Sequence, residues 1–60
     1  MAAVLKFVAW VLGQAWKYGW GVVKAVAAWA KVNWRTVLKW IEWGITYGTI
    51  LGWIKDILGL

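Results

Sequence analysis

The stretch NWRTVLKWIEWG, at residues 33–44, decides the fold of this chain. An α-helix places successive side chains 100° apart, so residues three or four positions apart share a face. One face of this stretch is polar and carries Arg35, Lys39 and Glu42. The opposite face is apolar and carries Trp34, Val37, Leu38 and Ile41. Because Asn33 suits an N-cap and Gly44 ends the pattern, the stretch predicts an amphipathic helix over residues 34–43.

The same helical period recurs on both sides of this stretch. It predicts three further helices, over residues 3–18, 22–31 and 46–58. Gly19 suits a left-handed C′ position after the first of them, and Gly59 is expected to stop the last. The expected fold is therefore all-α, a compact bundle of four short amphipathic helices that forms a single domain over residues 1–60.

The helical period also assigns side chains to faces. In the helix over residues 3–18, the expected apolar side carries Leu5, Val8, Leu12 and Trp16. In the helix over residues 22–31, the side with Lys24 and Lys31 carries the small residues Ala27 and Ala28, and the opposite side carries Val23, Val26 and Ala30. These assignments predict which side chains form the core.

Three glycines, Gly44, Gly48 and Gly52, recur every four residues near the C-terminus. This spacing is typical of closely packed transmembrane helices. A transmembrane span needs roughly 20 mostly apolar residues, whereas the longest stretch of this chain without a charge covers the 12 residues 43–54. We therefore expect Gly44 to cap a helix and the other two glycines to be close-packing points within the bundle.

The composition excludes most enzyme classes. The chain has 60 residues, no Cys, His, Ser or Pro, and only two carboxylates, Glu42 and Asp56. Thiolate or imidazole metal ligands, disulfides and the common catalytic triads are therefore excluded. We expect neither an enzyme nor a protein with a metal or cofactor, and no small-molecule substrate.

Charge and aromatic content point to a surface-active protein. The formal net charge is +5, 65% of the residues are hydrophobic and eight are Trp. A domain of this size buries only about 60% of the surface that its unfolded chain exposes. Apolar surface must therefore remain in contact with the surroundings, and such surface marks a protein or membrane contact.

The residues expected to form this contact are cations and indoles. The cations occur on the polar face of every predicted helix, and they are Lys6, Lys17, Lys24, Lys31, Arg35, Lys39 and Lys55. The indoles expected at the interface are Trp10, Trp20, Trp40 and Trp43. An indole has an apolar body and one N–H donor, so it collects between lipid tails and headgroups. Core packing is expected instead for Trp16, Trp29 and Trp34.

Two partners compete for a surface of this kind. Nucleic acid would attract the positive charge, and its bases could stack on indoles. However, the cations form no dense patch, and binding in a polar groove would not explain the large number of apolar residues. An anionic membrane uses both properties, because cations meet the headgroups while Trp and aliphatic side chains enter the interface. We therefore expect an anionic phospholipid membrane as the partner, and no nucleic acid; self-association on the membrane stays open.

Several segments resemble a known family, the leaderless bacteriocins of the aureocin and lacticin Q type. The segments are Met1-Ala2, Leu5-Lys6, Lys17-Tyr18-Gly19, Ala28-Trp29-Ala30, Val37-Leu38-Lys39-Trp40-Ile41 closing at Gly44, and Trp53-Ile54-Lys55-Asp56-Ile57-Leu58-Gly59. Order and spacing are similar from Lys17 to the C-terminus, about two-thirds of the chain. The resemblance implies a saposin-like fold, export without a leader peptide, and killing of Gram-positive bacteria by permeabilising their membranes without a protein receptor.

Two other classes of protein share this composition. One is a small Trp-rich helical module that binds a protein partner. The other is an intracellular membrane-active toxin of a toxin–antitoxin pair. Composition does not separate them from a secreted antimicrobial peptide; only the resemblance favours secretion.

Overall fold

The computed structural model describes residues 2–60 and contains five helices and no strand in this range. Met1, which the domain prediction and the resemblance include, lies outside the described residues. The helices are α1 (Ala2–Leu12), α2 (Ala15–Tyr18), α3 (Trp20–Val32), α4 (Trp34–Glu42) and α5 (Tyr47–Leu58). The predicted all-α bundle is confirmed.

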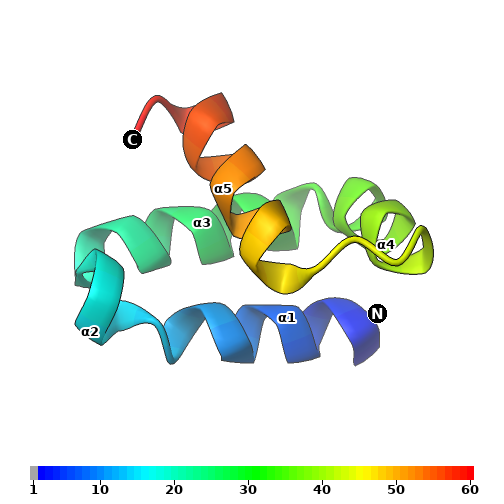
Figure 1. Cartoon of the computed structure of the whole chain (residues 1–60), viewed down its shortest axis with the longest axis horizontal. Helices are drawn as coiled ribbons and strands as arrows, with labels where there is room; N and C mark the ends of the chain where they lie inside the picture. The colour runs from blue at the N-terminus through cyan, green and yellow to red at the C-terminus, as the bar shows by residue number, and fades with distance from the viewer. Residues whose placement is uncertain (1) are drawn as a thin grey trace.

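The helices form a globule whose backbone extends 27 × 20 × 19 Å. Helices α1 and α3 lie side by side and run in opposite directions, joined by α2 at one end of the long axis (Figure 1). Helix α4 lies at the other end of this axis. From there a short loop leads back to the middle of the molecule, where α5 packs across α3 and α1.

The core is made of aliphatic side chains and one phenylalanine. In both α1 and α3 the buried residues recur with the spacing i, i+3, i+4, i+7, which gives each helix one continuous apolar face. The buried residues are Val4, Phe7, Val8 and Val11 in α1, Val23, Val26, Ala27 and Ala30 in α3, Val37 in α4, and Ile50, Leu51 and Ile54 in α5. No polar or charged side chain is buried among residues 2–60, so folding of these residues carries no free-energy cost for burying polar side chains. Ala27 was expected on the lysine side of its helix, and its burial shows that assignment to be wrong.

The predicted helix over residues 3–18 is two helices. The α-helical hydrogen bonds of α1 end with Gly13, whose N–H donates to the Ala9 carbonyl, while the Gln14 N–H donates to Val11 only three residues back. The Gln14 backbone has φ −91° and ψ 7°, outside the α-helical region, and its side-chain amide donates to the Trp10 carbonyl at 3.4 Å. This amide satisfies a terminal carbonyl of α1, and the backbone then restarts as α2 in a new direction.

Asn33 lies at the N-cap position of α4, as predicted. Its side chain makes no capping hydrogen bond to α4. The Asn33 amide instead donates to the Trp29 carbonyl at 3.1 Å, near the end of α3. Its own backbone carbonyl accepts from the N–H groups of Thr36 and Val37, so α4 begins directly after it. One asparagine therefore closes α3 with its side chain and opens α4 with its backbone.

Both ends of α5 have local explanations. Its N-cap is Thr46, whose hydroxyl accepts a hydrogen bond from the Thr49 N–H at 3.4 Å. Such a cap satisfies one of the free donors at a helix N-terminus. At the C-terminus the helix ends at Gly59, as predicted, and this residue takes the left-handed conformation with φ 73° and ψ 29°.

Gly48 and Gly52 do not pack closely against another helix. A Cβ atom placed on either residue would meet nothing within 4 Å. The expectation that they are close-packing points is therefore wrong, because α5 contacts the core with the face that carries Ile50, Leu51 and Ile54.

Gly19, between α2 and α3, is expected to be the least replaceable glycine. Its backbone has φ 87° and ψ 152°, a conformation that is essentially restricted to glycine and costs another residue about 1–3 kcal/mol. We expect Gly19→Ala to lower the free energy of unfolding by about 1–3 kcal/mol, measured by urea denaturation followed by far-UV circular dichroism.

Gly21, two residues later, is the matched control. It lies inside α3, and a Cβ atom there would meet nothing within 4 Å. Alanine favours a helix more than glycine does, so Gly21→Ala is expected not to destabilise the protein. Equal destabilisation by the two substitutions would contradict the role assigned to the Gly19 backbone.

Candidate membrane-binding surface

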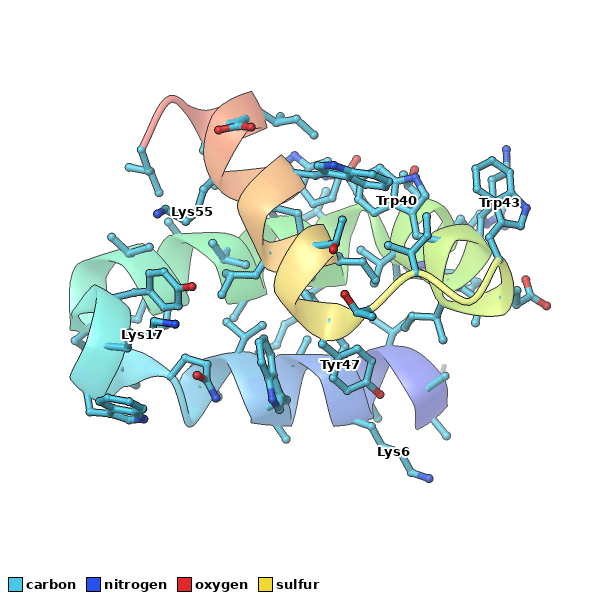
Figure 2. The ribbon with its side chains drawn as sticks, viewed as in Figure 1. Lys6, Lys17, Trp40, Trp43, Tyr47 and Lys55 are labelled. Atoms are coloured by element: carbon cyan, nitrogen blue, oxygen red, sulfur yellow. The ribbon has the colours of Figure 1, made fainter. Side chains whose placement is uncertain are left out.

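The seven predicted cations are spread over the whole molecule. Six of them are exposed, and they are Lys6, Lys17, Lys24, Lys31, Arg35 and Lys39. Lys55 is half-buried. Figure 2 shows Lys6 on the α1 side of the globule and Lys55 on the α5 side. The positive charge therefore faces several directions and forms no single patch.

Cations lie next to aromatic rings at several places. The Lys39 ammonium lies 5.5 Å from the ring centroid of Trp43, and the Arg35 guanidinium lies 5.3 Å from that of Trp34. These separations allow cation–π attraction. Each pair combines a charge that can meet a headgroup with an aromatic surface that can meet the acyl-chain boundary.

Tyr18 contacts two lysines. The ammonium of Lys55 in α5 lies 4.8 Å from the centroid of its ring, and that of Lys17 lies 5.4 Å from it. The contact with Lys55 joins α5 to α2, which are far apart in the sequence. Lys55 differs from the six exposed cations because it is half-buried and its aromatic partner lies in another helix.

The four indoles predicted at the interface divide into two pairs. Trp20 and Trp43 are exposed, at 58% and 67%. Trp10 is half-buried, and its ring centroid lies 6.4 Å from that of Phe7 and 5.6 Å from that of Tyr47. Trp40 is also half-buried and lies between Trp29 and Trp53, at centroid distances of 6.0 and 5.1 Å.

The stack of Trp29, Trp40 and Trp53 joins three helices, α3, α4 and α5. The first two rings are nearly parallel, with 10° between their planes, and the last two meet edge to face at 76°. Both arrangements suit aromatic rings, whose pairing adds about 0.5–1.5 kcal/mol beyond the area they bury. Trp53 remains 40% exposed, so the stack also contributes to the surface.

Trp16 and Trp53 are exposed indoles that sequence reasoning missed, and Trp16 is the more exposed of the two. Trp16 was expected in the core, but 82% of it is exposed. Trp29 and Trp34, also expected in the core, are half-buried and pack against it.

Leu5 and Leu12, expected on the same apolar side as Trp16, are also exposed, at 53% and 36%. Of the four residues assigned to that side only Val8 is buried, because α1 packs with the face that carries Val4, Phe7, Val8 and Val11. The face was therefore assigned wrongly within α1 itself, and the break at Gly13 and Gln14 then turns the chain before residue 16. The Gly13-Gln14 pair was the sequence signal for the break between α1 and α2, because glycine weakens a helix interior.

Exposed aliphatic side chains extend this surface. The largest exposed fractions are 80% at Val32, 55% at Ile57, 54% at Leu60 and 53% at Leu5. No helix within residues 2–60 combines the length and apolarity that a membrane span requires. No pocket was found in this range, and no three His, Cys, Asp or Glu side chains group there as they would around a metal ion.

The described surface thus combines exposed indoles, exposed aliphatic side chains and cations on one folded globule. Such a surface can bind an anionic, partly apolar partner by electrostatic attraction followed by burial of the indoles. Comparison of this chain with family models, with curated proteins and with solved structures finds no match.

Proposed function

We propose that this protein is a secreted cationic antimicrobial peptide, a bacteriocin that binds the anionic membranes of Gram-positive bacteria and permeabilises them without a protein receptor. The observation that carries the proposal is the exposure of Trp16, Trp20 and Trp43 on a globule with a net charge of +5. Large exposed aromatic side chains are costly in water. Their retention beside cations is explained by a partner that is both anionic and apolar.

The helix lengths favour action at the membrane interface. The longest helix, α3, has 13 residues, which corresponds to roughly 20 Å at 1.5 Å per residue. The hydrocarbon core of a bilayer is about 30 Å thick. A single helix of this protein therefore cannot span it without thinning the bilayer, so the proposed mechanism is interfacial insertion that disorders the bilayer or forms a lipid-lined pore.

Dye release from protein-free vesicles tests the proposal. Phosphatidylglycerol vesicles should release a trapped dye when the protein is added, and phosphatidylcholine vesicles should release much less. A helical module that docks on a protein partner would release none from either.

A second assay separates a secreted peptide from an intracellular toxin. The purified chain is added from outside to a Gram-positive indicator strain and, separately, is expressed inside a host cell. We expect killing from outside. Lethal expression together with harmless external addition would support the intracellular toxin instead.

Trp fluorescence reports which indoles enter the lipid. We expect the emission of the protein to shift to the blue on mixing with phosphatidylglycerol vesicles, because exposed indoles leave water for the interface. Replacing Trp16, Trp20 and Trp43 together by Phe should remove most of the shift, since the remaining indoles are half-buried or only 40% exposed.

The matched control for this variant replaces the stacked indoles Trp29 and Trp40 by Phe. It should retain the lipid-induced shift, because the three most exposed indoles remain. A parent protein whose emission stays constant at saturating lipid would contradict insertion of these indoles.

A further inference from the structure

Exposed indoles or aliphatic side chains, together with cations, occur at both ends of the long axis of the molecule. Helix α2 and the first turns of α3 lie at one end, and the last turn of α3 and all of α4 lie at the other (Figure 1). Figure 2 places Lys17 at the first end and Trp43 at the second. We name these regions the α2 end, defined by Trp16, Lys17, Trp20 and Lys24, and the α4 end, defined by Lys31, Val32, Arg35, Lys39, Glu42 and Trp43.

The two ends are matched in chemistry. The α2 end has two exposed lysines and no carboxylate, and the α4 end has three exposed cations and Glu42, so each carries a formal excess of two positive charges. Each also has two strongly exposed apolar side chains. The exposed fractions are 82% at Trp16 and 58% at Trp20 in the α2 end, and 80% at Val32 and 67% at Trp43 in the α4 end.

The length of the molecule keeps the two ends electrostatically independent. The backbone extends 27 Å along the long axis, whereas the attraction of a charged surface decays over about 8 Å at physiological salt. When one end rests on a bilayer, the other end therefore lies about three decay lengths away. Its cations stay unneutralised and its apolar side chains stay in water.

We propose that the protein bridges two anionic lipid bilayers, with the α2 end in one and the α4 end in the other, and so aggregates anionic membranes. This activity rests on the membrane binding of the proposed function but does not need permeabilisation. Bridging follows from bivalency: once the first end is bound, the second end meets any nearby bilayer at a high effective concentration. The negative charge of phosphatidylglycerol complements the positive excess of both ends.

The test measures aggregation and single-bilayer binding separately. Turbidity and light scattering report aggregation of phosphatidylglycerol vesicles, and a supported phosphatidylglycerol bilayer, which offers only one surface, reports binding. The parent should aggregate the vesicles at physiological salt and lose this activity at about 1 M salt or with phosphatidylcholine vesicles. Binding to the supported bilayer together with no vesicle aggregation at any protein-to-lipid ratio would overturn the proposal, because it would mean that both ends lie flat on one surface.

Two matched variants remove the apolar contacts of one end each and leave the net charge at +5. They are the double substitutions Trp16→Gln with Trp20→Gln, and Val32→Gln with Trp43→Gln. Each should lose vesicle aggregation yet still bind the supported bilayer through its intact end, and a variant with all four substitutions should lose both. Aggregation that persists in either double variant would overturn the assignment of the two ends.

Two further readouts separate this proposal from other outcomes. Sedimentation in lipid-free buffer should show a monomer; a dimer that disappears in either double variant would mean that an end binds a second copy of the chain, and would overturn bridging by one molecule. Dye release is measured in parallel. Aggregation without release would refute permeabilisation but support bridging, whereas release without aggregation would refute bridging alone.

Discussion

Phe7→Ala is expected to lower the free energy of unfolding by about 3–5 kcal/mol, the range for removing a buried aromatic ring. The Phe7 side chain is fully buried, and its ring contacts Tyr47 edge to face at a centroid distance of 5.4 Å. These contacts join α1 to the first residue of α5. A domain of 60 residues has a total stability of roughly 3–9 kcal/mol, so this one substitution removes a large part of it or all of it. Urea denaturation followed by far-UV circular dichroism measures the loss.

Leu5 provides the matched control for Phe7 within the same helix. Its side chain is 53% exposed, and substitutions at such positions usually change stability by no more than about 0.5 kcal/mol. Leu5→Ala should therefore unfold near the urea concentration of the parent. If it cost as much as Phe7→Ala, the packing face assigned to α1 would be wrong.

The comparison of Leu5 with Phe7 shows a wrong prediction, because Leu5 was expected in the core and is 53% exposed, whereas Phe7 is fully buried. Sequence reasoning succeeded in placing three of the helices. The helices over residues 22–31, 34–43 and 46–58 correspond to α3, α4 and α5, with ends that differ by at most two residues. Each prediction rested on a glycine or asparagine beside a clear helical period. Gly59 and Asn33 do lie at helix ends, although Asn33 acts through a different hydrogen bond.

The failures occurred where the helical phase changed or where both faces were apolar. Trp16 was assigned to the same side as Leu5 and Leu12, and all three are exposed. Both faces of α1 carry apolar residues, so the sequence did not show which of them packs, and the break at Gln14 then ends the helix before Trp16. Ala27 was placed with Lys24 because alanine fits either side of a helix; its burial depends on how closely α3 approaches its neighbours. The periodicity of apolar residues describes one helix and contains no information about how closely the neighbouring helix approaches it.

For the candidate surface, the exposure of the cations could be predicted from the sequence better than the exposure of the indoles. A lysine avoids burial in almost any fold, and six of the seven predicted cations are exposed. An indole fits a core, an interface or a surface. Trp10 was expected at the membrane interface; in the structure it is half-buried and packs on Phe7 and Tyr47, because α5 packs against α1 there. The burial of Trp10 depends on the packing of α5, whose residue Tyr47 is far from Trp10 in the sequence.

Replacing Lys17, Lys24, Lys31 and Lys39 by Gln is expected to weaken binding to an anionic bilayer and to preserve the fold. All four side chains are exposed, so no buried contact is lost. A lysine near an anionic surface contributes about 1 kcal/mol. The structure places two of the four at the α2 end and two at the α4 end. A globule that contacts one bilayer through one end therefore loses about 2 kcal/mol, or roughly 30-fold in affinity.

Binding to a supported phosphatidylglycerol bilayer at 0.1 M salt measures this change, and the size of the loss reports the orientation of the bound molecule. A globule lying with both ends on the lipid would lose roughly 4 kcal/mol, because all four lysines would then contribute. The affinity of the parent should fall as salt rises, since the decay length shortens from about 10 Å at 0.1 M to about 3 Å at 1 M. The Gln variant should depend less on salt.

The matched control replaces the same four lysines by Arg, which retains the charge at every position. It should bind as the parent does, and far-UV circular dichroism in buffer should show the parent's helix content for both variants. If the Gln variant folded normally and bound the bilayer as tightly as the parent at 0.1 M salt, electrostatic attraction would contribute little. Insertion of Trp16, Trp20 and Trp43 would then have to supply the affinity alone, and an uncharged phosphatidylcholine bilayer would bind the protein as well as an anionic one.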